Sequence, residues 1–130
     1  MQEKLKVEVY WNLHRHCWSV RACEGPQKGR VVAHADTVQL TDVTLVVQPA
    51  GNAKVRREGR KNVHAFARGR WHLNTVLVLS VTGSLTYNPY KDTTFVMPDN
   101  DGIRHPVTRA EYVVMTGDGV RPSVTAAGAS

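Results

Sequence analysis

The feature that most constrains this chain is a two-residue alternation of apolar and polar side chains near its beginning. Apolar side chains occupy every second position of residues 5–11, and a second alternating run covers residues 16–23. A period of two places such side chains on one face of an extended strand, whereas a helix requires a period of about 3.6. Residues 24–29 (EGPQKG) contain the Gly and Pro of a chain reversal, and a third strand is predicted at 30–35. The three runs predict an antiparallel meander.

Further strand patterns follow. In residues 38–47 the apolar positions are even-numbered up to residue 40 and odd-numbered from residue 43. Because a one-residue slip turns every following side chain to the other face, a bend, bulge or tight turn is predicted at Thr41 and Asp42. Strand patterns return at 62–72, 76–87, 94–97 and 110–115, and residues 76–81 are predicted to be buried on both faces.

One helix is predicted, over Pro49–Glu58. Proline is favoured at the first helical position, and Gly59 suits the left-handed residue that ends a helix. The helix is expected to pack through Val55 and its alanines, with its arginines turned outward. The fold class is therefore α+β, a predominantly antiparallel β-sheet (meander) with one short helix.

The length of 130 residues suits one domain. Residues 1–115 are predicted to form a single compact β-rich domain. Residues 116–130 consist mainly of Gly, Ala, Ser, Thr and Pro, so a flexible C-terminal tail is expected there. No apolar run approaches the roughly 18 residues of a membrane span, and the N-terminus lacks the apolar stretch of a secretion signal. The expectation is a soluble protein that does not enter a membrane.

The charge of the chain is unevenly distributed. Seventeen Lys and Arg against eleven Asp and Glu give a formal net charge of +6. Residues 1–71 contain thirteen basic and six acidic side chains, whereas residues 72–130 contain four and five. Seven of the eighteen residues from 54 to 71 are basic. Such a density of like charge is relieved by solvent or by an anionic partner.

We predict a ligand-binding site for phosphate and base around this basic run. Arginine forks match phosphate oxygens, and aromatic rings offer surfaces on which a base stacks. The candidates in the run are Arg56, Arg57, Arg60, Lys61, Asn62, His64, Phe66 and Arg68. Tyr10, Arg21 and Arg30 are added from the meander, and Tyr87 and Asn88 from the loop at 87–91 (YNPYK). The alternatives are a solvated helix face beside a strand edge guarded by charge, and a simple proline turn at 87–91.

Catalytic and metal sites are not favoured. Cys17 and Cys23 are expected to be reduced thiols, since six residues along one strand separate their Cα atoms far beyond the reach of a disulfide. The nearby His14 and His16 lack the spacing of a zinc site. No phosphate-binding glycine loop, nucleophile elbow or metalloprotease motif occurs, so neither enzymatic activity nor a cofactor is expected.

The segments 9–14 (VYWNLH), 60–66 (RKNVHAF) and 87–91 (YNPYK) resemble those of a family of small proteins encoded by tailed bacteriophages. The resemblance spans most of residues 7–115. It implies a phage or prophage origin. In that family the turn after Asn12 and Leu13 often lacks the second histidine and the cysteine present here, which further disfavours a zinc site.

Phage proteins of this size without enzyme motifs are often counter-defence factors. The first functional hypothesis is therefore a protein of the host bacterial cytoplasm, similar in type to the sponges used against Thoeris and CBASS defence. It would bind and sequester a cyclic nucleotide or another anionic nucleotide as a homo-oligomer. The alternatives are a nucleic-acid-binding protein or an inhibitor of a host nuclease complex of the anti-CRISPR type, and a structural component of the virion.

Overall fold

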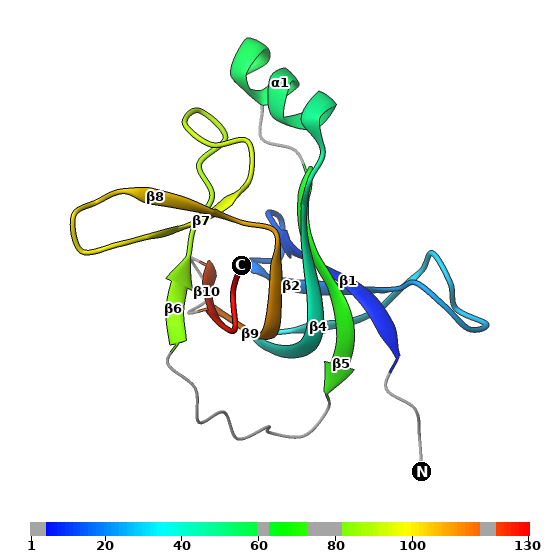
Figure 1. Ribbon diagram of the computed structural model, residues 1–130. Coiled ribbons are helices and arrows are strands. Elements are labelled where there is room, and N and C mark those ends of the chain that lie inside the picture. Colours follow the sequence, from blue (N-terminus) through cyan, green and yellow to red (C-terminus); the bar gives the residue numbers. More distant parts are fainter. Residues whose placement is uncertain (1–4, 60–62, 73–81, 118–121) are drawn as a thin grey trace.

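The computed structural model describes residues 5–59, 63–72, 82–117 and 122–130 (Figure 1). The described residues form ten strands and one helix. In chain order they are β1 (Lys6–Asn12), β2 (Cys17–Ala22), β3 (Val31–Ala35), β4 (Thr37–Val47), α1 (Pro49–Glu58), β5 (Ala65–His72), β6 (Thr82–Leu85), β7 (Phe95–Pro98), β8 (Arg104–Val107), β9 (Arg109–Gly117) and β10 (Pro122–Ala127). No helix in these ranges has the length and apolar character needed to traverse a bilayer.

Eight strands form one sheet in the order β3-β2-β1-β5-β4-β9-β10-β6, and β7 and β8 pair in a small second sheet. All of these strand pairs are antiparallel. This confirms the predicted α+β class, a mostly antiparallel sheet with one short helix. The first three strands form the predicted meander, since β1 pairs with β2 and β2 pairs with β3.

The large sheet is strongly curved (Figure 1). The Trp18 indole Nε1 of β2 donates a hydrogen bond of 3.0 Å to the carbonyl oxygen of Thr116 in β9. Three strands, β1, β5 and β4, separate β2 from β9 in the sheet order, so this bond spans the concave side. The core lies on that side, and Val7, Val9, Val20 and Leu40 are fully enclosed there.

The phase change predicted in residues 38–47 is confirmed. The pairing of β4 with β5 shifts register between Thr41 and Thr44, and Asp42 adopts a positive φ of 52°. This irregularity returns Val43 and Leu45 to the core face that Leu40 already occupies. A regular strand would have turned one of the two apolar sets to solvent.

The helix occupies the predicted residues, and Gly59 ends it with φ 68° in the left-handed region. Its packing differs in part from the prediction. Val55 is buried as expected, but the second buried residue is Asn52, and the alanines are exposed. Gly51 allows this packing, because a Cβ atom there would lie 2.3 Å from the Cβ of His64.

The prediction of a flexible tail over residues 116–130 is wrong for residues 116–117 and 122–130, which the structure describes. Residues 116 and 117 end β9, and β10 pairs with β9 on one side and with β6 on the other. Val124, Ala126 and Ala127 are buried. The main chain of Ser130 exchanges hydrogen bonds with Arg109. Small side chains resemble a linker in sequence, but here they fit a strand buried between two others.

Two other predicted segments differ from the structure. The predicted strand 76–87 is described only from residue 82, where β6 begins, and residues 76–81 lie outside the described ranges. Strand β8 was not predicted, because Pro106 interrupts a short segment without apolar alternation. It forms because proline is tolerated in a two-stranded edge such as the β7–β8 pair.

Substitutions in β10 test whether this strand is part of the folded core. Val124 is buried and its neighbour Ser123 is exposed on the other face. Val124→Asp is expected to lower the free energy of unfolding by about 3 kcal/mol, because it buries an unpaired charge. The matched Ser123→Asp change is expected to stay within about 0.5 kcal/mol. Urea unfolding followed by circular dichroism measures both, and equal effects of the two variants would contradict the placement of β10.

Candidate ligand-binding site

A groove of ≈ 420 Å³ lies on the convex face of the sheet, at β1, β2, β5 and the turn after β2. Four cationic side chains and one carboxylate border it, so its lining carries a formal excess of positive charge. The lining residues are Lys6, Glu8, Arg21, Ala22, Cys23, Lys28, Gly29 and Arg68. This volume lies within the usual range for small-molecule sites, about 300–1,000 Å³.

Glu8 stands at the centre of the groove because of strand register. On β1 it lies directly opposite Arg21 of β2 and opposite Arg68 of β5. Arg68 Nη2 donates a hydrogen bond of 2.8 Å to Glu8 Oε1, and Arg21 Nη2 donates to Oε2. Burial raises the pKa of Glu8, but the hydrogen bonds and charges of Arg21 and Arg68 outweigh it, so that the pKa is lowered overall. One carboxylate therefore holds two guanidinium groups side by side.

Aromatic rings lie against both arginines. The guanidinium carbon of Arg21 is 6.0 Å from the centre of the Tyr10 ring, and that of Arg68 is 5.6 Å from the centre of the Phe66 ring. These separations are within the range of cation–π contacts. Four of the predicted site residues, from strands distant in the sequence, thus gather on one face of the sheet.

The sequence prediction missed the other charged residues of this groove. Lys6 and Glu8 share the polar face of β1 with Tyr10, so the alternation already contained a signal for them. Lys28 is an exposed residue of the turn between Gly25 and Gly29, which both have a positive φ. No local pattern indicates that this turn folds beside β5, because the contact depends on the pairing of β1 with β5.

Other predicted site residues lie at α1 and serve internal contacts. Arg56 Nε donates to the carbonyl oxygen of Pro89 at 2.5 Å, and its Nη2 donates to that of Asp92 at 3.3 Å. The Asn88 side-chain oxygen accepts a hydrogen bond of 2.9 Å from the Tyr90 main-chain N–H. Arg56 and Asn88 therefore stabilise the loop after β6 and its contact with the helix.

His64 and Tyr87 belong to a polar cluster beneath α1. Asn52 Nδ2 donates to the Tyr87 hydroxyl oxygen at 2.5 Å, and this oxygen lies 2.7 Å from His64 Nε2. Asn52 and His64 are buried, and burial raises the pKa of Tyr87. The cluster joins the helix to the residues that precede β5 and follow β6.

The remaining predicted site residues are separate from both groups. Arg57 is exposed on α1, and Arg30 is exposed in the turn before β3. Arg60, Lys61 and Asn62 lie outside the described residues. The described part of the basic run therefore divides between α1 and the convex face, and it does not form one patch.

One of the two cysteines, Cys23, borders the same groove. Cys17 and Cys23 are both free thiols. Burial raises the pKa of Cys23, and the neighbouring Glu8 adds to the effect, so the thiol form is favoured there. Within the described ranges, no group of three or more His, Cys, Asp or Glu side chains is placed to hold a metal ion.

An ion pair anchors the loop after β6 to the β7–β8 hairpin. Arg104 donates to both carboxylate oxygens of Asp92, with Nε–Oδ1 at 2.9 Å and Nη2–Oδ2 at 2.5 Å. The main-chain N–H of Asn88 donates to Oδ2 at 2.8 Å. The side chain of Asp92 is 4% exposed. The Arg104 hydrogen bonds are the main reason that the pKa of Asp92 is lowered.

The chain is thus a β-rich protein with a cation-lined groove on the convex side of a curved sheet. Residues 1–123 match the family model of the Mycobacterium phage L5 gene 82 protein. The chain is 41% identical over 124 residues to the gene 82 protein of Mycobacterium phage L5, which covers 90% of this chain and 94% of that relative. The chain therefore belongs to this bacteriophage protein family. This confirms the prediction, made from the sequence, that it is related to phage proteins. No solved structure matches it.

The ion pair of Asp92 yields a prediction about pH. Since the pKa of Asp92 is lower in the folded than in the unfolded chain, its stabilising effect is complete above the unfolded value of about 3.9 and is lost as the pH falls through the folded value. Asp92→Asn is expected to lower the free energy of unfolding by about 1–2 kcal/mol at pH 7. The difference from the unmodified protein is expected to shrink at pH 3.

Urea unfolding at both pH values measures this difference. The control is Asp101→Asn, which changes an exposed aspartate in the β7–β8 turn. It is expected to leave the free energy of unfolding nearly unchanged at either pH. A deficit of Asp92→Asn that is equal at pH 7 and pH 3 would show that the carboxylate charge contributes nothing.

Proposed function

We propose that this phage protein binds an anionic nucleotide, without catalysis, in the groove on the convex face, and thereby sequesters a signal of host defence. The observation that carries the proposal is the lining of the groove, where Lys6, Arg21, Lys28 and Arg68 surround a single carboxylate. Guanidinium groups bind phosphate through paired hydrogen bonds, and lysine adds a mobile point charge. The aromatic ring of Tyr10 beside Arg21 supplies a surface for the base.

The role of Glu8 in this proposal is that of an internal substitute for phosphate. It orients Arg21 and Arg68 in the absence of ligand and keeps two like charges close together. An incoming phosphate competes with this carboxylate for the same two guanidinium groups. The nucleotide therefore needs the further attraction of Lys6 and Lys28 to displace it, which favours a ligand with more than one negative charge.

The expected homo-oligomer and the host cytoplasm remain predictions. Light scattering coupled to size-exclusion chromatography measures the oligomeric state of the purified protein. A nucleic-acid-binding protein is the second candidate, because the groove is a cationic surface that a longer phosphate chain could also follow. The two candidates differ in salt dependence, since the affinity for a long polyanion falls steeply with salt.

The test is isothermal titration calorimetry with cyclic mononucleotides, cyclic dinucleotides, a short DNA duplex and single-stranded RNA at two salt concentrations. Lys28→Gln is expected to weaken nucleotide binding about fivefold, equivalent to roughly 1 kcal/mol. Glu8→Gln is expected to strengthen it by a similar factor, because the competing charge is removed while the hydrogen-bond acceptor is kept.

Arg57→Gln on the exposed face of α1 is the matched control and should leave affinity unchanged. Loss of binding in Arg57→Gln, with Lys28→Gln unaffected, would move the site to the helix, where the basic run begins. Failure of every nucleotide and nucleic acid to bind would overturn the proposal. Tight binding of the duplex alone, with steep loss in salt, would favour the second candidate.

A further inference from the structure

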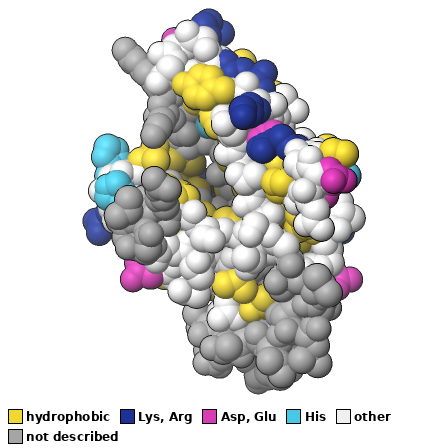
Figure 2. Space-filling view, turned by 90° about the vertical axis from the view of Figure 1, so that its left-hand side faces the viewer, with side chains coloured by type: hydrophobic (Ala, Val, Ile, Leu, Met, Phe, Trp, Pro, Cys, Tyr) yellow, Lys and Arg dark blue, Asp and Glu magenta, His cyan; other side chains and the backbone are white. Residues whose placement is uncertain are grey.

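A hollow on the concave face of the sheet is chemically unlike the convex groove. Figure 2 shows a depression whose floor consists of hydrophobic side chains. It comprises two adjoining spaces of ≈ 220 Å³ and ≈ 270 Å³, and both are bordered by Trp11, Ala65 and Tyr87. No Lys, Arg, Asp or Glu side chain is among the described residues that border either space. An apolar cavity of roughly 150 Å³ already suffices to bind benzene.

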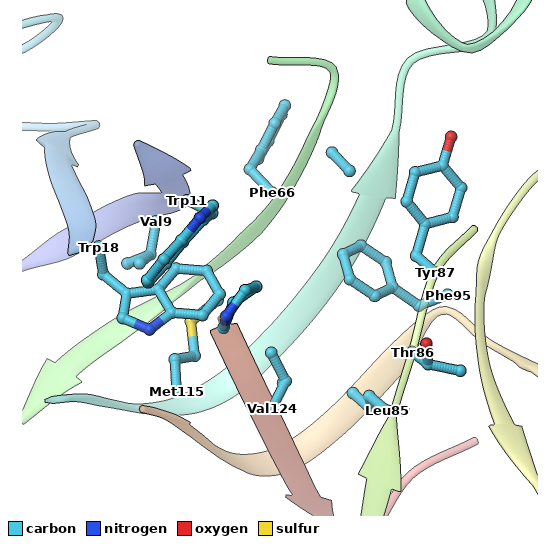
Figure 3. Close-up of a pocket in the computed structure, with 12 residues that line it drawn as sticks. Val9, Trp11, Trp18, Phe66, Leu85, Thr86, Tyr87, Phe95, Met115 and Val124 are labelled. Carbon is cyan, nitrogen blue, oxygen red and sulfur yellow. The ribbon is translucent and has the colours of Figure 1, made fainter. Parts of the chain in front are cut away.

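Aromatic rings form two walls of this hollow. Trp11 and Trp18 contact each other edge to face, with ring centres 5.1 Å apart. Tyr87 and Phe95 form a second pair with centres 5.7 Å apart. Figure 3 shows the tryptophans on one side of the space and the Tyr87 and Phe95 rings on the other. Aromatic walls of this kind favour a flat ring, which contacts them through its face or its edge.

Among the polar groups of these four aromatic side chains, one is available to a ligand. The indole N–H of Trp18 is used by Thr116, and the Tyr87 hydroxyl contacts Asn52 and His64. The indole Nε1 of Trp11 donates to no acceptor in the described part of the chain. Every buried side-chain nitrogen or oxygen atom of the described residues has a hydrogen-bond partner. Since the Trp11 N–H has none, it is not buried and remains accessible to solvent. It is a donor at the edge of an apolar, aromatic space.

We infer that this hollow is a second binding site, independent of the convex groove, for a neutral planar nitrogen heteroaromatic molecule. The ring system packs between the Trp11–Trp18 and Tyr87–Phe95 pairs, and a ring nitrogen accepts the hydrogen bond of Trp11 Nε1. The absence of charged side chains among its described lining excludes an ionic group from this position, because a buried charge there would lack compensation. Both a nucleobase and a non-nucleotide heteroaromatic compound have this chemistry.

The test compares quinoline with indole by ligand-detected NMR and tryptophan fluorescence. The two molecules have fused rings of similar size, but only quinoline has a ring nitrogen that accepts a hydrogen bond. Quinoline is expected to bind about fivefold more tightly than indole. Trp11→Phe keeps an aromatic wall without the N–H and is expected to remove this preference. Trp71→Phe, at a tryptophan that does not border the hollow, is the matched control and should preserve it.

A second variant fills the space. Ala65 borders both parts of the hollow, so Ala65→Leu is expected to reduce quinoline binding at least tenfold in a protein whose circular dichroism is unchanged. Should Ala65→Leu fail to fold, Trp11→Phe alone decides the outcome. Adenine that displaces quinoline would identify a nucleobase as the natural class, and adenine that does not would identify a non-nucleotide heteroaromatic compound. No binding of quinoline at millimolar concentration, or a quinoline preference that survives Trp11→Phe, would overturn the inference.

Discussion

The structure depends on the closure of its sheet between β2 and β9. Trp18 provides this closure, since the residue is 4% exposed within the core and its indole N–H donates to the carbonyl oxygen of Thr116 across three intervening strands. A flat sheet of eight strands would leave one apolar face in water, because the one short helix of the described residues cannot cover it. Curvature removes the problem, since the concave side becomes an interior that the strands share.

The same curvature separates two kinds of surface. Side chains alternate across each strand, so β1 turns Val7 and Val9 to the interior and Lys6, Glu8 and Tyr10 to the exterior. On the outside, antiparallel register brings Arg21 and Arg68 to the two sides of Glu8. On the inside, Trp11 near the end of the same strand borders the aromatic hollow. A cationic groove and an apolar hollow thus arise from opposite faces of the same strands.

Local patterns predicted much of the fold, as particular residues show. The phase change near Asp42 and the helix end at Gly59 were both visible, because each leaves a trace within a few residues. Strand β10 was missed because Val124 and Ala126 have no distinctive pattern until β9 and β6 lie beside them. Glycine in a helix interior is destabilising, yet the missing side chain of Gly51 is what lets the helix approach His64.

For the basic run of residues 54–71, too, the sequence predicted one part of the arrangement and folding determined the rest. Its composition determined that arginines and aromatic residues would lie close together along the chain, and the strand period determined that Phe66 and Arg68 share one face. Only the tertiary structure decided which charges meet. It pairs Arg68 with Glu8 through strand register and turns Arg56 to the loop after β6. Periodicity is a property of neighbours in the chain, whereas a binding surface requires side chains that folding brings together from distant strands.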